Sequence, residues 1–417
     1  MAAKKSKKVE YVRRMYEQPT FVIGVDVSKA YLTTCAVQLS GLEMERKRFY
    51  NSGNGFKAFY AWLQRLKHKY GYQFAVVGLE PTGTYSKPLI YFLAARGVCI
   101  VQVNPVHVKR SKDMEDNSPD KSDKKDPKVI ANLVREGKFL TVLVLTGPYA
   151  RLRQLVRARD RAVAARTQCI NQMEAAVAEI FPEFLQLIGD LTRKPALELL
   201  SRCPTPRAIL SMGLEGLQEL VYKTSRGRIR RDRVEALWIA AQESVGVEEA
   251  VEETVEELRF LVKLVRDHTA FIEAQEKQIR SLVQTIPYGE QLLSIQGIGP
   301  LTVAVVLGEL GDLRRFRTRR DVLKHAGLNL YRLSSGTYQG LPRISKRGSG
   351  LVRKYLFLVA MAMVRPGGIY HDFYQRYISR HEVRIKGIVA VMRKLLALMF
   401  ALVRKQEYFD ATVLAAA

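Results

Sequence analysis

The stretch that decides the N-terminal fold is TFVIGVDVSKAYLTTCAVQL, residues 20–39. Its apolar residues alternate, and the alternation breaks once, at Ser28-Lys29-Ala30, which predicts two strands joined by a tight turn. A third strand is expected at Glu43–Phe49. A helix is expected next, because apolar residues then recur at helical spacing: Phe56, Phe59, Trp62, Leu63 and Leu66.

Strands and helices then alternate. The sequence predicts a buried strand at Phe74–Leu79, a helix at Lys87–Arg96 and a strand at Val98–Val103. Three strands followed by strand–helix alternation is the order of an RNase H-like α/β domain. We therefore expect this domain over residues 20–148, preceded by a flexible basic arm over residues 1–19.

The middle of the chain has helical heptads. Apolar residues recur every seven positions within Ala150–Ile180, and a second run within Val251–Val283 is broken only at Thr269 and Glu276. This predicts a coiled-coil-like antiparallel hairpin over residues 149–286, with a small helical insertion at 181–246. Ordinary amphipathic helices packed on a domain remain the alternative.

A basic, helical C-terminal domain is expected over residues 287–410. Between Asp312 and Lys354 there are twelve Lys or Arg and two Asp, which marks a DNA-facing surface. The segment Ile295–Thr302 is typical of a helix-hairpin-helix, in which Gly297 and Gly299 let backbone N–H groups approach a DNA phosphate. An ordinary helix–helix turn is the alternative.

The composition indicates a partner with a phosphate backbone. The chain has 417 residues, with 67 Lys or Arg against 41 Asp or Glu, a net charge of +26. No apolar stretch is long enough for a membrane span, and the basic N-terminus has no apolar segment of a signal peptide. The four cysteines lack metal-ligand spacing and a disulfide pattern, so we expect a cytoplasmic protein without zinc.

Four acids are candidates for a Mg²⁺ site. Asp26 lies within an apolar strand, where Asp is unusual, and Glu80 directly follows the buried strand Phe74–Leu79. Asp123 and Asp126 are three apart and start a helix at Pro127. A turn contact for Asp26 and helix capping for the aspartate before Pro127 are the structural alternatives. Together the acids suit a divalent cation, which prefers oxygen ligands.

A serine loop is the second chemical candidate. Ser334 and Ser335 precede Gly336, and a serine acting as nucleophile needs a phosphate held nearby by cations. The flanking cations are Arg332, Arg343, Lys346 and Arg347. No general base stands beside the serines in sequence, and a turn is the alternative for Ser-Ser-Gly taken alone.

In order, the strings GVDVSK, GLEPTGTY, KSDKKDPKVIA, SIQGIGPLTV, HAGLNLYRLSSG and RISKRG resemble the DEDD-type transposases of bacterial insertion sequences. These are bridge-RNA-guided recombinases with a RuvC-like N-terminal domain and a helical C-terminal transposase domain. The resemblance spans about Thr20 to Arg404. It implies that Asp26, Glu80, Asp123 and Asp126 bind Mg²⁺, with Mn²⁺ as an alternative, and that Ser335, or else Ser334, is the nucleophile. One departure is Pro127, where similar members usually have Ala.

The resemblance also implies a mechanism and partners. A guide (bridge) RNA would pair with donor and target DNA, and the serine would form a 5′-phosphoserine link. The active site would be composite and assembled between protomers, in a dimer or a dimer of dimers, with the heptad hairpin as a dimerisation element. The alternatives are a Mg²⁺-dependent junction nuclease without a covalent intermediate, and a non-catalytic nucleic-acid-binding protein.

Overall fold

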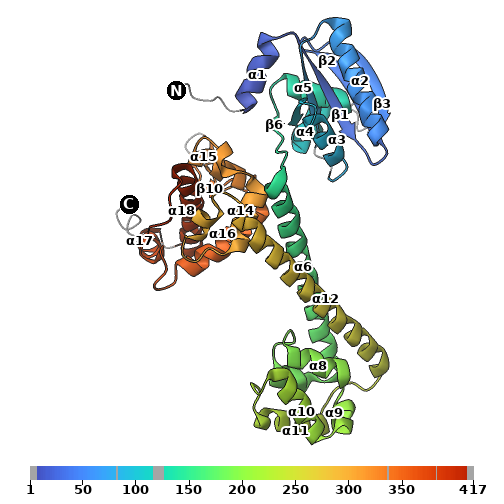
Figure 1. Cartoon of the computed structure of the whole chain (residues 1–417), viewed down its shortest axis with the longest axis vertical. Coiled ribbons are helices and arrows are strands. Elements are labelled where there is room, and N and C mark those ends of the chain that lie inside the picture. The colour runs from blue at the N-terminus through green and yellow to red at the C-terminus, as the bar shows by residue number, and fades with distance from the viewer. Residues whose placement is uncertain (1–6, 81–82, 116–125, 336–337, 382, 411–417) are drawn as a thin grey trace. The chain divides into compact units, whose positions relative to one another are not determined.

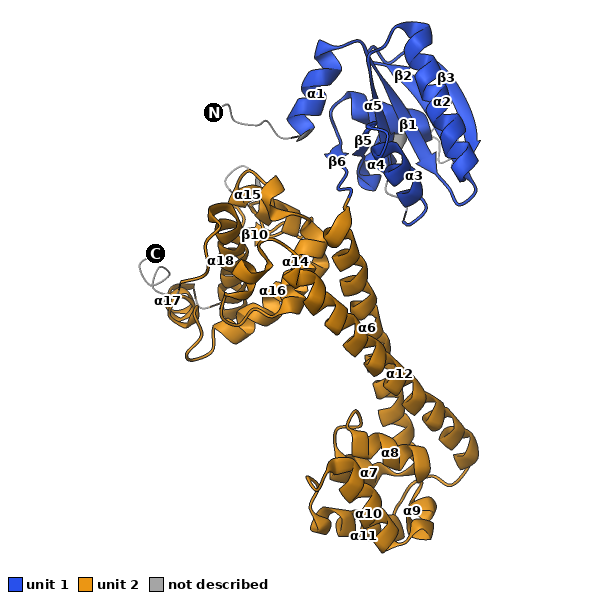
Figure 2. Cartoon of the chain, in the orientation of Figure 1, with its two compact units in different colours: residues 1–144 blue, residues 145–417 orange. Residues whose placement is uncertain are grey.

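The computed structural model describes residues 7–80, 83–115, 126–335, 338–381 and 383–410. The chain divides into two compact units, residues 1–144 and residues 145–417 (Figure 2). Among the described residues, no helix combines the length and the apolar character needed to cross a membrane.

The first unit is built on a six-stranded sheet with the order β3-β2-β1-β4-β5-β6 (Figure 1). The first three strands are antiparallel neighbours, β4 is parallel to β1, β5 is parallel to β4, and β6 is antiparallel to β5. This confirms the three-stranded start followed by strand–helix alternation that is typical of an RNase H-like domain. The strands are β1 (Thr20–Val27), β2 (Tyr31–Gln38), β3 (Glu43–Tyr50), β4 (Phe74–Leu79), β5 (Cys99–Gln102) and β6 (Leu140–Thr141).

Helices cover both faces of this sheet. Because side chains alternate along a strand, β1 sends Ile23 and Val25 to one face and Val22 to the other. The first face packs against α2 (Gly53–Tyr70) and α3 (Lys87–Ala94). The second face packs against α1 (Lys7–Glu17), α4 (Pro105–Glu115) and α5 (Asp126–Arg135).

The prediction of a flexible basic arm over residues 1–19 is corrected over residues 7–17, where the structure has helix α1, while residues 1–6 lie outside the described residues. Met15 is buried, and Tyr11 and Val12 pack beside it against the second face of the sheet. The Arg14 guanidinium lies 4.4 Å from the centroid of the Phe74 ring. The prediction was wrong because the basic residues hide an apolar stripe, which the helical spacing of these three side chains creates.

Two long helices of the second unit, α6 (Gly147–Ile180) and α12 (Val251–Gln284), form the hairpin expected from the heptads (Figure 1). Most of the heptad residues are buried within the same chain. At one end Val262 and Val265 share a core with Met173 and Val177, and at the other Ile279 and Val283 share one with Leu152 and Val156. The seam is therefore intramolecular.

The two polar breaks in the heptads are matched by arginines of α6. Arg166 Nη1 donates to Thr269 Oγ1 over 3.3 Å, and Arg159 Nη2 donates to Glu276 Oε1 over 2.7 Å. Arg159 Nη1 also donates to the hydroxyl of Tyr355 over 2.6 Å. Polar side chains of the two helices are thus paired at the two positions where the apolar pattern stops.

The predicted insertion is helical and shares a core with the tip of the hairpin. Large side chains from its helices, including Phe184, Leu200, Leu217 and Leu237, are fully buried there. Its helices are α7 (Pro182–Ile188), α8 (Lys194–Arg202), α9 (Pro206–Met212), α10 (Leu214–Ser225) and α11 (Arg231–Gln242).

The C-terminal helices pack around the base of the hairpin. Gly308 allows a close approach: a Cβ atom there would lie 2.8 Å from the backbone nitrogen of Arg153 in α6. Arg153 Nε donates to the carbonyl oxygen of Gly308 over 2.9 Å. These helices are α13 (Gly289–Leu293), α14 (Pro300–Leu310), α15 (Arg319–Ala326), α16 (Gly350–Met363), α17 (His371–His381) and α18 (Arg384–Lys405).

A β-arm interrupts the C-terminal helices, where sequence analysis predicted helices and loops alone. Its strands are β7 (Leu330–Tyr331), β8 (Ser334–Ser335), β9 (Tyr338–Gln339) and β10 (Arg343–Ile344). Strand β7 pairs with β10 and β8 pairs with β9, both antiparallel. Strands of two residues give no periodic signal, so the apolar pattern could not predict them.

Candidate active site

Asp26 and Glu80 lie side by side at the carboxyl end of two parallel strands. The register of β1 with β4 ends at Val25 and Leu79, and the next residues are Asp26, still in β1, and Glu80, directly after β4. Neighbours in register point to the same face of a sheet, so both carboxylates belong to the face that α5 covers. Both side chains are partly exposed.

Helix α5 crosses this face directly over two glycines, Gly24 of β1 and Gly78 of β4, which are register partners. A Cβ atom on Gly24 would lie 1.8 Å from the carbonyl oxygen of Pro127. A Cβ atom on Gly78 would lie 2.5 Å from Cγ2 of Val134. Only glycine leaves room for the helix at these positions.

The direction of α5 brings Asp126 to the same end of the sheet. At the C-terminal end of α5, Arg135 Nη1 donates to the carbonyl oxygen of Leu39 over 3.3 Å, next to the start of β1. The first residue of α5, Asp126, therefore lies at the opposite end of β1, where Asp26 stands. Its Oδ1 atom is buried.

Three of the predicted acids thus share one end and one face of the sheet, and Asp123 lies outside the described residues. Over the part of the chain that the structure describes, no three His, Cys, Asp or Glu side chains come close enough together to hold a metal ion. The donor set itself fits a hard divalent cation, because carboxylate oxygens are its preferred ligands.

Ser335 lies in the second unit, near the tip of the β-arm. Its register partner is Tyr338, and its side chain is exposed. Ser334 pairs with Gln339 in the same hairpin. Gly340 N donates to the carbonyl oxygen of Leu333 over 2.8 Å, which closes the hairpin behind the serines.

The predicted phosphate-binding cations lie on this arm and at its base. Arg332, Arg343, Lys346 and Arg347 all have exposed side chains. The base is held by Lys346 N, which donates to the carbonyl oxygen of Gly327 over 3.0 Å. Gly348 has a packing role, because a Cβ atom there would lie 2.3 Å from the carbonyl oxygen of His325.

The predicted glycine turn joins α13 to α14. Gly297 has a positive φ of 84°, and both Gly297 and Gly299 are exposed, while Ile295 and Ile298 beside them are buried. The turn therefore presents its glycine backbone to solvent and anchors itself with the isoleucines.

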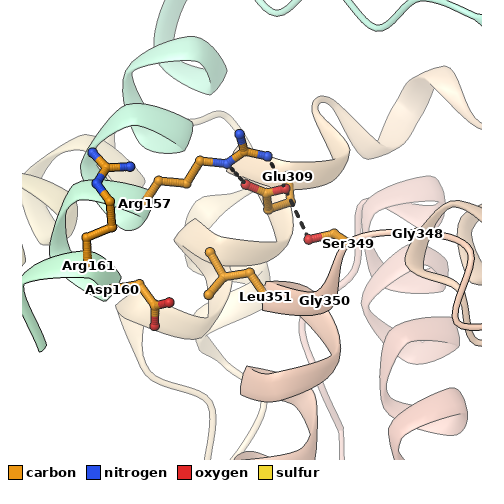
Figure 3. Close-up of a pocket in the computed structure, with 8 residues that line it drawn as sticks. All are labelled: Arg157, Asp160, Arg161, Glu309, Gly348, Ser349, Gly350 and Leu351. Carbon is orange, nitrogen blue, oxygen red and sulfur yellow. Dashed lines mark hydrogen bonds and ion pairs between the residues drawn. The ribbon is translucent and has the colours of Figure 1, made fainter. Parts of the chain in front are cut away.

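A pocket of about 430 Å³ next to the base of the β-arm was missed by sequence analysis (Figure 3). Within it, Glu309 of α14 is almost fully buried and accepts bonds from Arg157 Nε at 2.6 Å and Nη2 at 3.0 Å, and from Ser349 Oγ at 3.0 Å. Burial alone would raise the pKa of Glu309, but the bonds from Arg157 and Ser349 lower it below its ordinary value. The signal was present in the sequence, since Glu309 stands in the apolar run VAVVLGEL.

Glu309 couples three elements of the second unit. It joins α6 through Arg157 to the start of α16 through Ser349, which is the N-cap of that helix. The basic segment Lys346–Gly348 directly precedes Ser349. The bonds of Glu309 to Arg157 and Ser349 therefore hold the base of the β-arm against the helical core.

Two family models match this chain, one in each of its two units. A family model described as a transposase, of the DEDD type of IS110 elements, matches residues 23–182. A second, described as the transposase IS116/IS110/IS902 family, matches residues 289–375. The first covers Asp26, Glu80, Asp123 and Asp126, and the second covers Ser335.

Two relatives match this chain over nearly the whole length of both proteins. The "Insertion element IS110 uncharacterized 43.6 kDa protein" of Streptomyces coelicolor is 25% identical over 93% of this chain and 95% of its own length. The "Transposase for insertion sequence element IS1111A" of Coxiella burnetii is 23% identical over 95% of this chain and 93% of its own length. A solved structure, T. thermophilus RuvC in complex with a Holliday junction substrate, matches 30% of this chain and 99% of its own with 13% identity and a TM-score of 0.23.

The two matched models and the full-length relatives define the class as transposases, enzymes that cleave and join DNA. Within that class, the chain belongs to the DEDD-type transposases of insertion sequences of the IS110 family.

Proposed function

We propose that this transposase is guided by an RNA and recombines donor and target DNA through a serine nucleophile assisted by a Mg²⁺ site. The observation that carries the metal site is the convergence of Asp26, Glu80 and Asp126 on one end and one face of the sheet. Asp123, three residues before Asp126, would complete the set. Bound there, a divalent cation would supply positive charge beside the scissile phosphate.

Ser335 is the proposed nucleophile. Its exposed hydroxyl near the tip of the β-arm can reach a phosphate without rearrangement of the core. In the proposed step Ser335 Oγ forms a bond to phosphorus, the bond from phosphorus to the 3′ oxygen breaks, and the serine proton ends on that 3′ oxygen. The products are a 5′-phosphoserine link and a free 3′ hydroxyl. Exposed Arg332 and Arg343 would hold the phosphate and stabilise its developing charge.

The proposed active site is composite, because the acids belong to the first unit and Ser335 to the second. The family resemblance implies assembly between protomers, in a dimer or a dimer of dimers. Most heptad residues are buried within one chain, which favours another surface of the hairpin or of the units for the proposed oligomer.

The test is a covalent-adduct assay on the full chain. The protein is mixed with RNA transcribed from the flank of its element, Mg²⁺, and labelled donor and target DNA, and the products are separated on a denaturing gel. Wild type is compared with Ser335→Ala, Ser334→Ala and Asp126→Asn, each with and without the RNA. We expect a protein–DNA band that needs the RNA and is lost in Ser335→Ala and Asp126→Asn, but is retained in Ser334→Ala.

Other results would reject parts of the proposal. Loss of the band in Ser334→Ala alone would identify Ser334, and not Ser335, as the nucleophile. Cleavage without an adduct, unchanged in Ser335→Ala, would make the protein a metal-dependent nuclease. An adduct that forms equally well without RNA would reject the proposal that an RNA guides the reaction.

A further inference from the structure

An aromatic and basic cluster lies on the outer strands of the first unit. The rings of Tyr31 on β2 and Tyr50 on β3 are register partners with centroids 5.1 Å apart, inclined at 34°. The Arg48 guanidinium lies 3.7 Å from the centroid of the Tyr31 ring. We call Tyr31, Arg48 and Tyr50 the tyrosine platform.

The tyrosine platform shares a sheet face with the candidate acids. In the antiparallel register, Asp26 pairs with Thr33 and Thr33 pairs with Arg48, so these side chains point to the same face. Tyr31 lies two residues before Thr33 and therefore faces the same way. The platform and Asp26 thus form one continuous surface that runs outward from the acids to the edge strand β3.

A hydrogen-bonded junction ties the tyrosine platform to the segment after Glu80. Asn51 directly follows Tyr50, and its Nδ2 donates to the carbonyl oxygen of Ser28 at 2.8 Å and of Tyr85 at 3.4 Å. Ser28 belongs to the turn after β1, and Tyr85 follows Glu80 by five residues and is exposed. The platform is therefore anchored to the chain segments that follow Asp26 and Glu80.

Cross-strand packing accounts for the pairing of the two tyrosines. It does not cover Tyr50, which is 66% exposed, or Arg48, which is exposed as well. Farther along, the same face carries the buried residues Cys35 and Val37 beneath the helices. An uncovered ring beside a guanidinium is the combination that binds single-stranded nucleic acid, by stacking on bases and pairing with phosphates.

We propose that the tyrosine platform binds an unpaired nucleotide of the strand whose phosphate lies at the acids, with the base stacked on Tyr50 and Arg48 contacting the backbone. This deepens the proposed function and rests on it for the position of the phosphate. It predicts that the substrate enters this site as a single strand or with frayed bases, since a base inside a duplex has no free face.

The experiment is photocross-linking of the full chain to single-stranded oligonucleotides that carry 5-iodouracil, once as DNA and once as RNA. It is done with a metal chelator and without cleavage, so failure of the proposed chemistry leaves its readout unaffected. Cross-linked peptides are mapped after trypsin digestion, which releases Tyr50 in the peptide of residues 49–57. We expect the cross-link in this peptide, and a more efficient one with the DNA oligonucleotide than with the RNA, because the strand cut at the acids is DNA.

Three variants sharpen the test. Tyr50→Ala should lose the cross-link and bind the single strand about tenfold more weakly, which corresponds to about 1.4 kcal/mol and lies within the range for one stacked base, while its affinity for a duplex of the same length stays unchanged. Tyr50→Phe should retain both properties. Tyr70→Ala, which removes an exposed tyrosine at the end of α2, is the matched control and should behave as wild type. Cross-links that map only elsewhere, or a Tyr50→Ala variant that weakens single-strand and duplex binding equally, would overturn the proposal.

Discussion

Gly24 of β1 and Pro127 of α5 are in backbone contact: no side-chain atom fits between the α-carbon of Gly24 and the carbonyl oxygen of Pro127. This contact fixes the height of α5 above the sheet at the residue that follows Asp126. It therefore links the glycine of the first strand to the position of an acid 102 residues away along the chain.

Replacing Gly24 by alanine should displace α5. The added methyl group must push the helix away, and overpacking of this kind costs about 1–3 kcal/mol of unfolding free energy. We expect a lower unfolding midpoint in denaturant for the first unit and a loss of DNA cleavage greater than the loss of stability explains. Gly53→Ala is the control, since no atom lies within 4 Å of a Cβ atom there. Equal stability and activity in both variants would contradict the close contact.

Replacing Glu309 by glutamine should destabilise the second unit at neutral pH by about 1–3 kcal/mol, because buried partners lose a charged acceptor. The pKa of Glu309 in the folded chain is lower than its ordinary 4.5. Its ionised form therefore stabilises the fold above about pH 4.5, and this contribution is lost as the pH falls through the folded pKa.

The difference in melting temperature between wild type and Glu309→Gln should accordingly shrink below about pH 4.5, as calorimetry over a pH series can measure. Glu290→Gln is the matched control, because Glu290 is exposed in α13 of the same unit. A difference that stays constant, or grows, as the pH falls would refute the assignment.

Arg159 should contribute more to the unfolding free energy of the hairpin than its neighbours in α6 do. Arg159→Ala removes bonds to Glu276 and to Tyr355, and we expect a loss of about 1–3 kcal/mol because two partly buried acceptors lose their donor. A double-mutant cycle with Glu276→Ala should give a coupling free energy of about 0.5–3 kcal/mol. Arg151→Ala, at an exposed position of the same helix, should have little effect. Zero coupling in the cycle would show that the pair does not stabilise the hairpin.

The cysteines should be unreactive until the chain unfolds. All four are free and buried. Burial raises the pKa of Cys35 to about 11 and of Cys99 to about 12, so little reactive thiolate forms at neutral pH. A thiol reagent should label the native chain slowly and label four thiols after guanidinium is added. Rapid labelling of the native chain would contradict this burial.

Several elements could be predicted because their signals are local. The alternation in residues 20–39 predicts β1, its turn and β2, and the heptads predict α6 and α12. Helix α1 and the β-arm were not predicted, because the apolar pattern is weak in both. In α1 the apolar stripe is short and surrounded by Lys and Arg, and in the β-arm each strand has two residues, too few for a period to show.

By itself the sequence determined the types of element, the charge of the surface and the identity of the candidate acids, since each depends on residues close together in the chain. Only the tertiary structure decided which of these residues meet. It placed Asp126 at the end of β1 through two glycines, buried most of the heptad residues within one chain, and paired Glu309 with Arg157 across 152 positions. Such contacts depend on the register of strands and the packing of helices, and no local pattern specifies either.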